Sequence, residues 1–272
     1  MHKSMIFLKK FLLKFQINKY SAFVWNSSKN SFNHIKNTNR IDINLIVGVE
    51  RQKKTLLNNT KNFALGNFTN NALLWGSRGN GKSSLVRSIF YFLSKNHSNL
   101  KLIQLNKNNI FDIEKLYPLL EKFSELRFII FIDDLSFEKI DSEYKIIKST
   151  LDGSIQSQPK NIVIYVTSNR RHLMPRDMID NERSSAIHTD ESVEEKISLS
   201  DRFGLWIGFH NFNQLEYLKI IKTYCEYFKI IYDKKIEQES VKWSLQRGNR
   251  TGRTAWQFII QIAADRNLKI DF

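Results

Sequence analysis

Short apolar runs alternate with amphipathic stretches through the middle of the chain, and this alternation predicts an α/β fold. Runs of strand length lie at residues 71–75, 100–105, 128–132, 162–167 and 205–209, and stretches with helical character lie at 83–95, 114–123 and 143–152. In the first helical stretch, Leu85, Ile89 and Leu93 recur at a spacing that places their side chains on one helix face. Strands that are almost continuously apolar are typical of a parallel sheet covered by helices on both faces.

The strand-length runs end at residue 209, and the remainder of the chain is helical in pattern. Three helical stretches follow, at 215–228, 235–246 and 254–268. At the other end, residues 1–20 place apolar side chains on one side of a helix and lysines on another, while residues 26–40 are polar and lack periodicity, which favours a linker or loop. We therefore expect a basic N-terminal segment with a linker (1–40), an α/β core (41–209) and a small helical lid (210–272).

Positive charge is concentrated at the start of the chain. The formal net charge is +15, and residues 1–40 hold eight basic side chains and no acidic one. Such a segment suits a polyanion, either nucleic acid or an anionic membrane surface, and we expect salt-sensitive binding to one of them that is lost when residues 1–20 are deleted. A targeting segment fits the same pattern. For the charge elsewhere, a coding bias toward AT-rich codons explains the many Lys, Asn and Ile residues equally well.

Composition narrows the class of protein. With 42% hydrophobic and 25% charged residues, the chain has an ordinary globular composition, which argues against disorder or low complexity. Its single cysteine, Cys225, excludes an internal disulfide and a cysteine-based zinc site, so a reducing compartment, the cytoplasm, is expected. No apolar run approaches the roughly 18–20 residues of a membrane span, so we expect any membrane association to be peripheral. Trp206, Trp243 and Trp256 fall on strand or helix positions and are expected in the core.

A glycine-rich motif links the first strand of the core to the helix that follows. The residues Gly76, Ser77, Arg78, Gly79, Asn80, Gly81, Lys82 and Ser83 match the P-loop spacing G-x-x-x-x-G-K-[ST]. In such a loop, backbone N–H groups point at phosphate oxygens, and Ser84 lies beside them in the first turn of the helix. Lys82 is then expected to reach the β- and γ-phosphates, and the Ser83 hydroxyl to take one coordination position of Mg²⁺. The alternative is a glycine-rich turn with no ligand.

Two carboxylates follow the apolar run at 128–132. Because an acid at the carboxyl end of a buried parallel strand faces the ligand crevice, Asp133 is expected to hold Mg²⁺ through water. Asp134 is then placed to polarise the water that attacks the γ-phosphate. The alternatives for Asp134 are a helix N-cap and a solvated turn acid.

Three further elements resemble parts of the AAA+ ATPases. The strand at 162–167 leads into Thr167-Ser168-Asn169, which resembles sensor 1, with Asn169 as the sensing residue. The segment Ser200-Asp201-Arg202-Phe203 resembles the arginine-finger box, with Arg202 as the finger. The segment Arg250-Thr251-Gly252-Arg253 resembles sensor 2, in which an arginine of the lid, here Arg253, reaches back to the phosphates.

The longer sequences around these motifs are similar to those of one bacterial family. The blocks NALLWGSRGNGKSSL, FIIFIDDLSFE, VTSNRRHLMP, EEKISLSDRFGLWIGF and RTGRTAWQF resemble the stand-alone AAA+ ATPases called domain of unknown function 815, over residues 42–268. The resemblance implies an αβα sandwich with a five-stranded parallel sheet in the order 5-1-4-3-2, a helical lid, and ATP with Mg²⁺ bound between them. It also implies a homo-oligomer, either a ring or a helical assembly, in which Arg202 acts on the ATP of a neighbouring subunit.

These features favour an ATP hydrolase that couples its nucleotide state to the remodelling or loading of a macromolecular client. The alternative is an ATP-gated binding switch that hydrolyses weakly and docks on nucleic acid or a membrane through the basic residues 1–40. A small-molecule P-loop kinase is a third hypothesis, although such a kinase needs neither sensor 2 nor the arginine-finger box.

Overall fold

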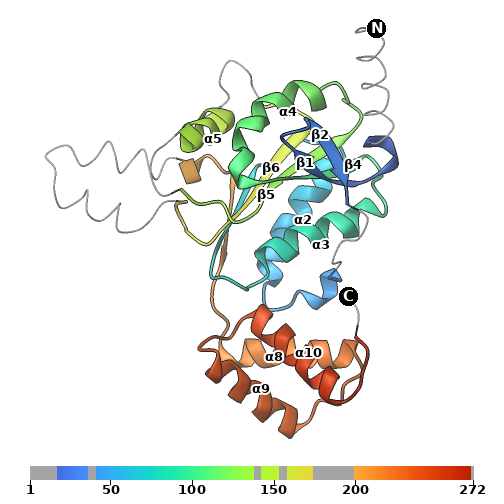
Figure 1. Ribbon diagram of the computed structural model, residues 1–272, viewed down its shortest axis with the longest axis vertical. Coiled ribbons are helices and arrows are strands. Elements are labelled where there is room, and N and C mark those ends of the chain that lie inside the picture. Colours follow the sequence, from blue (N-terminus) through green and yellow to red (C-terminus); the bar gives the residue numbers. More distant parts are fainter. Residues whose placement is uncertain (1–16, 36–40, 138–141, 153–157, 174–198, 271–272) are drawn as a thin grey trace, which may run out of the picture.

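The fold is built on one sheet. The computed structural model describes residues 17–35, 41–137, 142–152, 158–173 and 199–270 (Figure 1). Within these residues the strands are β1 (Ala22–Asn26), β2 (Ser31–His34), β3 (Ala72–Gly76), β4 (Leu100–Leu105), β5 (Arg127–Ile132), β6 (Ile162–Ser168) and β7 (Leu205–Phe209). They form a seven-stranded sheet in the order β2-β1-β4-β5-β6-β3-β7. All neighbours are parallel except β1 and β2, which pair antiparallel.

The expected α/β class is confirmed, but the expected sheet of five strands is wrong because β1 and β2 extend it. The five strands expected from the sequence are adjacent within the larger sheet, as β7-β3-β6-β5-β4. The interpretation of residues 26–40 as a linker is wrong for Ser31–His34, which pairs with β1, while β1 pairs with β4. A strand of four residues with one buried side chain, Phe32, is too short to give a readable alternation.

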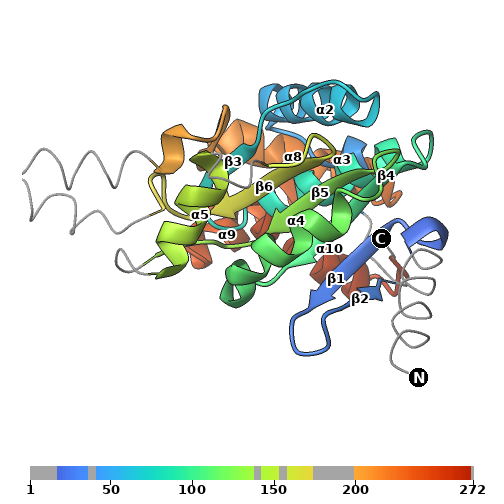
Figure 2. The same cartoon turned by 90° about the horizontal axis from the view of Figure 1, so that it is seen from above.

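Helices cover both faces of the sheet. The described helices of the core are α2 (Glu50–Ala64), α3 (Lys82–Ser94), α4 (Ile113–Leu120) and α5 (Ser142–Asp152), with short 3₁₀ segments η1 (Ile43–Leu45) and η2 (Lys107–Asp112). Figure 2 shows α2 and α4 on opposite sides of the sheet. The apolar cluster on one side contains Leu56 and Leu85 of α2 and α3, and the cluster on the other contains Leu116 and Ile147 of α4 and α5. Burial of the sheet on both faces explains why its strands are almost continuously apolar.

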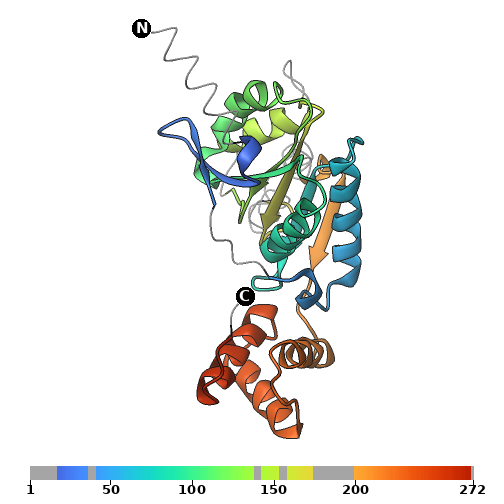
Figure 3. The ribbon, with the colours of Figure 1, turned by 90° about the vertical axis from the view of Figure 1, so that its right-hand side faces the viewer.

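Three helices follow β7, as expected, and form the lid. They are α8 (Gln214–Tyr227), α9 (Lys234–Gln246) and α10 (Gly252–Asp265), and they lie beyond the end of β7 that leads into them (Figures 1 and 3). Side chains that accept from the first-turn amides cap all three: Asn213, which forms a capping box, Asp233 and Thr251. The lid shares one apolar cluster with α2 and α3, so a domain boundary at residue 209 stays a prediction. Among the described residues, no helix has the length and apolar character needed to cross a membrane.

A buried carboxylate attaches the added strand β1 to the core. Asp112, only 3% exposed, accepts hydrogen bonds from Trp25 Nε1 (2.8 Å) and Lys115 Nζ (2.6 Å). Burial raises the pKa of Asp112, but the hydrogen bonds from Lys115, Ser27 and Trp25 outweigh it and hold the pKa below its ordinary value of 3.8. The charged form therefore stabilises the folded state above pH 3.8, and this contribution is lost as the pH falls through the folded-state pKa.

We expect Asp112→Asn to lower the free energy of unfolding at pH 7 by about 1–2 kcal/mol, because a charge-assisted hydrogen bond is stronger than a neutral one. The difference in the free energy of unfolding between Asp112→Asn and wild type should become smaller as the pH falls below 3.8. Urea unfolding at a series of pH values measures this difference. Asp265→Asn is the control, since Asp265 is exposed and contacts the Gln261 side chain of its own helix. Equal stability of Asp112→Asn and wild type at pH 7 would contradict the role of this carboxylate.

Candidate functional site

The glycine-rich loop is folded tightly against the end of β7. Gly76 has a φ of +125°, and a Cβ at this position would lie 1.9 Å from the carbonyl oxygen of Phe209. The amide of Ser77 donates to the same carbonyl at 3.0 Å. Gly79 and Gly81 also have positive φ, of +80° and +87°, which favours glycine at both positions. The loop therefore turns sharply between β3 and α3, as the P-loop spacing requires.

Lys82 lies at the start of α3, with its ammonium group inside the loop. Nζ donates to the carbonyl oxygens of Gly76 (2.7 Å) and Ser77 (2.8 Å) and to Oδ1 of Asn169 (3.1 Å). Burial lowers the pKa of Lys82 to about 8, although the two acids that follow β5 act in the opposite direction. The ammonium is thus only partly compensated by its neighbours, and a phosphate group would supply the missing negative charge.

Asp133 follows β5 and faces the first turn of α3. Its Oδ1 accepts hydrogen bonds from the Ser83 hydroxyl and from Thr167 Oγ1 (2.6 Å), and its Oδ2 pairs with Arg87 at 3.0 Å. A hydroxyl and a carboxylate in contact are hard oxygen donors of the kind that Mg²⁺ takes alongside phosphate oxygens and water, so these residues fit the ion. Among the residues described, no group of three or more His, Cys, Asp or Glu residues could hold a metal ion.

Asp134 turns away from the strand in an unusual conformation. Its φ is +55°, which is uncommon for a residue other than glycine, and its amide donates to Thr167 Oγ1 at 2.9 Å. The carboxylate is exposed and accepts a hydrogen bond from the side-chain amide of Asn169. No helix begins at residues 135–137, so the interpretation of Asp134 as a helix N-cap is wrong. A hydrogen-bonded path runs from Lys82 through Asn169 to Asp134.

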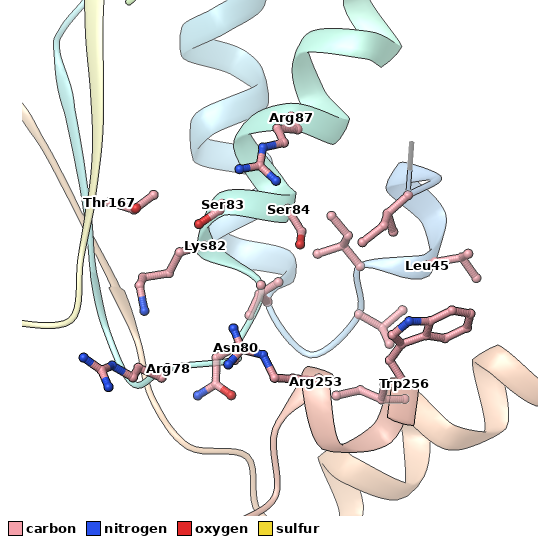
Figure 4. Close-up of a pocket in the computed structure, with 18 of the residues that line it drawn as sticks. Leu45, Arg78, Asn80, Lys82, Ser83, Ser84, Arg87, Thr167, Arg253 and Trp256 are labelled. Atoms are coloured by element: carbon pink, nitrogen blue, oxygen red, sulfur yellow. The ribbon is translucent and has the colours of Figure 1, made fainter. Parts of the chain in front are cut away.

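These residues line one cleft of about 630 Å³, a size that suits a small-molecule ligand. Its polar side carries the loop residues Arg78, Gly79, Asn80, Gly81, Lys82, Ser83 and Ser84, with Asp133, Asp134, Asn169 and Arg253. Its other side is apolar and includes Leu45, Val49 and Trp256. In Figure 4, Lys82 and Ser83 lie on one side, and Leu45 with Trp256 on the other. The cleft therefore has one end suited to phosphates and one suited to a flat apolar group.

The apolar wall of the cleft was not found from the sequence. It includes Ile41, Leu45, Ile46, Val47 and Val49, which precede α2. The available signal was the short apolar run at residues 45–49, between the polar stretch and the P-loop. Trp256 was expected in the core; it packs on Tyr224 and Phe228 and also lines the cleft.

Arg253 reaches the cleft because the lid contacts the P-loop directly. The amide of Arg253 donates to the carbonyl oxygen of Gly79 at 3.0 Å. A Cβ at Gly79 would lie 3.0 Å from Oγ1 of Thr251, the N-cap of α10. The first turn of α10 therefore rests on the loop and places Arg253 at the polar side of the cleft.

Residues 18–266 match the family described as "Protein of unknown function (DUF815)". The chain belongs to this family. The match spans nearly the whole chain, β1 and β2 included, so the two added strands lie within the part that defines DUF815. No curated protein matches this DUF815 chain in sequence.

Several solved structures share the fold of this DUF815 protein. One is the Holliday junction branch migration motor RuvB of Thermotoga maritima, with 18% sequence identity and a TM-score of 0.53; the match covers 83% of this chain and 66% of RuvB. Another is domain III of the Thermotoga maritima replication initiation protein DnaA, with 14% identity and a TM-score of 0.53; the match covers 85% of this chain and 91% of that domain. A third is the ORC1 protein of Aeropyrum pernix, solved in complex with DNA, with 16% identity and a TM-score of 0.55; the match covers 84% of this chain and 65% of ORC1. The chain thus spans about two thirds of RuvB and of ORC1. The likeness confirms the AAA+ P-loop fold, and at these identities it shows the fold alone.

Arg202 of this DUF815 chain is not part of its own cleft. It precedes β7, whose pairing with β3 places Leu205 opposite Ala72 and Phe209 opposite Gly76. Arg202 is therefore separated from the P-loop by the length of a strand, about 13 Å or more at 3.3 Å per residue. It lines a separate cavity of about 340 Å³ with Asn71 and other residues at the amino end of the sheet. An action on nucleotide would require the cleft of a second copy, and that role stays a prediction.

Proposed function

We propose that this protein binds ATP together with Mg²⁺ and hydrolyses it. The observation that carries the proposal is the convergence of Lys82, Ser83, Asp133, Asp134 and Asn169 on one end of one cleft. These residues come from the ends of β5 and β6 and from the start of α3. A cation, a pair of metal-binding oxygens and a polar group beside a carboxylate are the parts that phosphoryl transfer to water requires.

Some of these residues would bind the phosphates and the metal ion, and others would orient the attacking water. Backbone N–H groups at the start of α3 and the Lys82 ammonium would bind the β- and γ-phosphates. Ser83 and Asp133 would hold Mg²⁺, which neutralises charge on those phosphates when bound. Asp134 would polarise the attacking water, and Asn169, which touches both Lys82 and Asp134, would fix that carboxylate relative to the γ-phosphate. The apolar wall with Leu45 and Trp256 would receive the base.

The arrangement of Arg202 supports hydrolysis within a homo-oligomer, either a ring or a helical assembly. Since Arg202 lies at the end of β7 opposite the P-loop, it could complete only the cleft of a neighbouring copy. An arginine supplied in this way contributes about 10³–10⁵-fold to phosphoryl transfer, so an isolated subunit would be a slow enzyme. Head-to-tail contacts of one kind produce such assemblies.

The work coupled to hydrolysis would be the remodelling or loading of a macromolecule. A nucleic acid is the partner supported by the basic residues 1–40 and by two structural relatives, a Holliday junction motor and an ORC1 protein complexed with DNA. An anionic membrane surface would satisfy the same charge. Of this basic segment, residues 1–16 and 36–40 lie outside the described part of the chain, so its contact with a polyanion stays a proposal.

Asp134→Asn tests the proposal. We expect it to lower ATP turnover by about 10²-fold, because an amide cannot polarise the attacking water as a carboxylate does. ATP binding should be retained, because Asp134 is assigned no phosphate or metal contact. Phosphate release at high protein concentration and titration with a fluorescent ATP analogue measure the two effects. Asp265→Asn, the same exchange at an exposed site on α10, is the matched control.

Three outcomes separate the hypotheses. Turnover that survives in Asp134→Asn would contradict the assigned role of this residue. A wild-type protein that binds ATP but shows no turnover at any concentration, with or without a polyanion, would favour an ATP-gated switch. A wild-type protein that binds no ATP would contradict the proposed function itself.

A further inference from the structure

Both oxygens of the Asp133 carboxylate accept hydrogen bonds from protein donors. Oδ1 accepts from Ser83 and Thr167, and Oδ2 accepts from Arg87 Nη2 at 3.0 Å. Arg87 lies four residues after Ser83 on α3, so one face of this helix presents both donors to the same carboxylate. The oxygens that would serve a divalent cation are therefore held by a hydroxyl on one side and a guanidinium on the other.

Arg87 is held in this position by two contacts. Besides the ion pair, its Cζ lies 5.7 Å from the centroid of the Phe131 ring, within the range of a cation–π contact. Its side chain is 37% exposed and that of Asp133 is 27% exposed, so the pair is open to the cleft and can separate without moving the core. Figure 4 shows Arg87 on α3, one turn beyond Ser83.

The charges that line the cleft indicate how the ion pair between Arg87 and Asp133 affects nucleotide binding. The cleft is lined by Arg78, Lys82, Arg87 and Arg253 and by the acids Asp133 and Asp134. Phosphates entering without a metal ion would meet the Asp133 carboxylate close by, and a cation paired with that carboxylate offsets this repulsion. Arg87 and a divalent cation are therefore alternative partners for the same oxygens.

We propose that Arg87 is a positioning residue that takes the place of the divalent cation at Asp133, so that nucleotide binds even without metal. Arg87 thereby sets how strongly nucleotide binding depends on Mg²⁺. This inference rests on the proposed function of the cleft, and it assigns Arg87 an effect on binding that acts through Asp133.

The test is the dissociation constant for ATP, measured by calorimetry in EDTA and in excess Mg²⁺. We expect Arg87→Gln to raise the dissociation constant for ATP in EDTA by about tenfold or more, which corresponds to about 1.4 kcal/mol of lost interaction. In excess Mg²⁺ the dissociation constant should change by less than about threefold. Arg87→Lys, which keeps the charge, should restore most of the metal-free affinity. Arg51→Gln, which removes the same charge from an exposed position on α2 outside the cleft, is the control.

A double substitution distinguishes an effect through Asp133 from direct contact with phosphate. In the Asp133→Asn background, Arg87→Gln should cause no further loss of metal-free affinity, because the charge that Arg87 offsets is already absent. A tenfold loss that persists in this background would overturn the inference, as would an Arg87→Gln variant with the wild-type ratio of the two dissociation constants. In either of these cases ATP is still bound, so the proposed function stands. If the wild type binds no ATP in either condition, the proposed function and this inference both fail.

Discussion

Lys82→Ala is expected to lower kcat/KM for ATP by about 10³-fold, at the upper end of what removal of one stabilising donor costs. The ammonium is buried and donates to three oxygens, those of Gly76, Ser77 and Asn169. Alanine removes the charge that would bind the phosphates and leaves these oxygens without their donor. Lys82 would contact the phosphates in the ground state and more strongly in the transition state, where their charge shifts, so ATP affinity and turnover should both fall. A fluorescent ATP analogue measures the affinity, and phosphate release measures the turnover.

Lys95→Ala provides the control for Lys82. Lys95 lies at the other end of α3 and is exposed, so its loss removes the same charge from the same helix without touching the cleft. We expect its kinetics to match those of wild type. If Lys82→Ala keeps turnover and ATP affinity within about threefold of Lys95→Ala, the P-loop assignment is wrong.

Gly76→Ala is expected to destabilise the fold by more than about 4 kcal/mol, in the exceptional range for a single substitution. The new Cβ would lie 1.9 Å from the carbonyl oxygen of Phe209, and φ is +125° at this position. Since Gly76 pairs with Phe209 where β3 meets β7, the clash forces the edge strand away from the sheet. With a shift of about 2–4 °C per kcal/mol, the midpoint of thermal unfolding should fall by about 10 °C or more.

Gly248→Ala separates the clash from the cost of a positive φ alone. Gly248 has a φ of +65°, and apart from its two chain neighbours no atom of the described residues lies within 4 Å of the position of its Cβ. The expected cost is about 1 kcal/mol, since alanine tolerates the left-handed region poorly but meets no neighbour here. If Gly76→Ala unfolds at the same temperature as Gly248→Ala, then β3 and β7 do not approach as closely as the structure shows.

Most residues on the polar side of the cleft could be predicted from the sequence. Residues 76–83 form a loop whose geometry depends on a few consecutive positions, so its spacing can be read directly. Asp133 and Asn169 could be placed because the carboxyl ends of parallel strands meet at one edge of a sheet. Both side chains do lie in the cleft with Lys82.

Other parts of the site depended on contacts between distant segments. The apolar wall at residues 41–49 has no motif of its own and becomes part of the cleft only because α8 and α10 of the lid pack opposite it. The contact between Arg87 and Asp133 joins residues 46 apart in the chain. On the sequence alone, Arg87 was one more basic residue in an amphipathic helix.

The sequence by itself determined the alternation of strands and helices, the P-loop and the acids after β5, because these depend on periodicity and spacing between near neighbours. Only the tertiary structure decided that β1 and β2 extend the sheet, that Arg87 forms an ion pair with Asp133, and that Arg202 lies the length of a strand from the P-loop of its own chain. Each of these depends on which distant segments become neighbours. That choice is made by packing over the whole core rather than by local pattern.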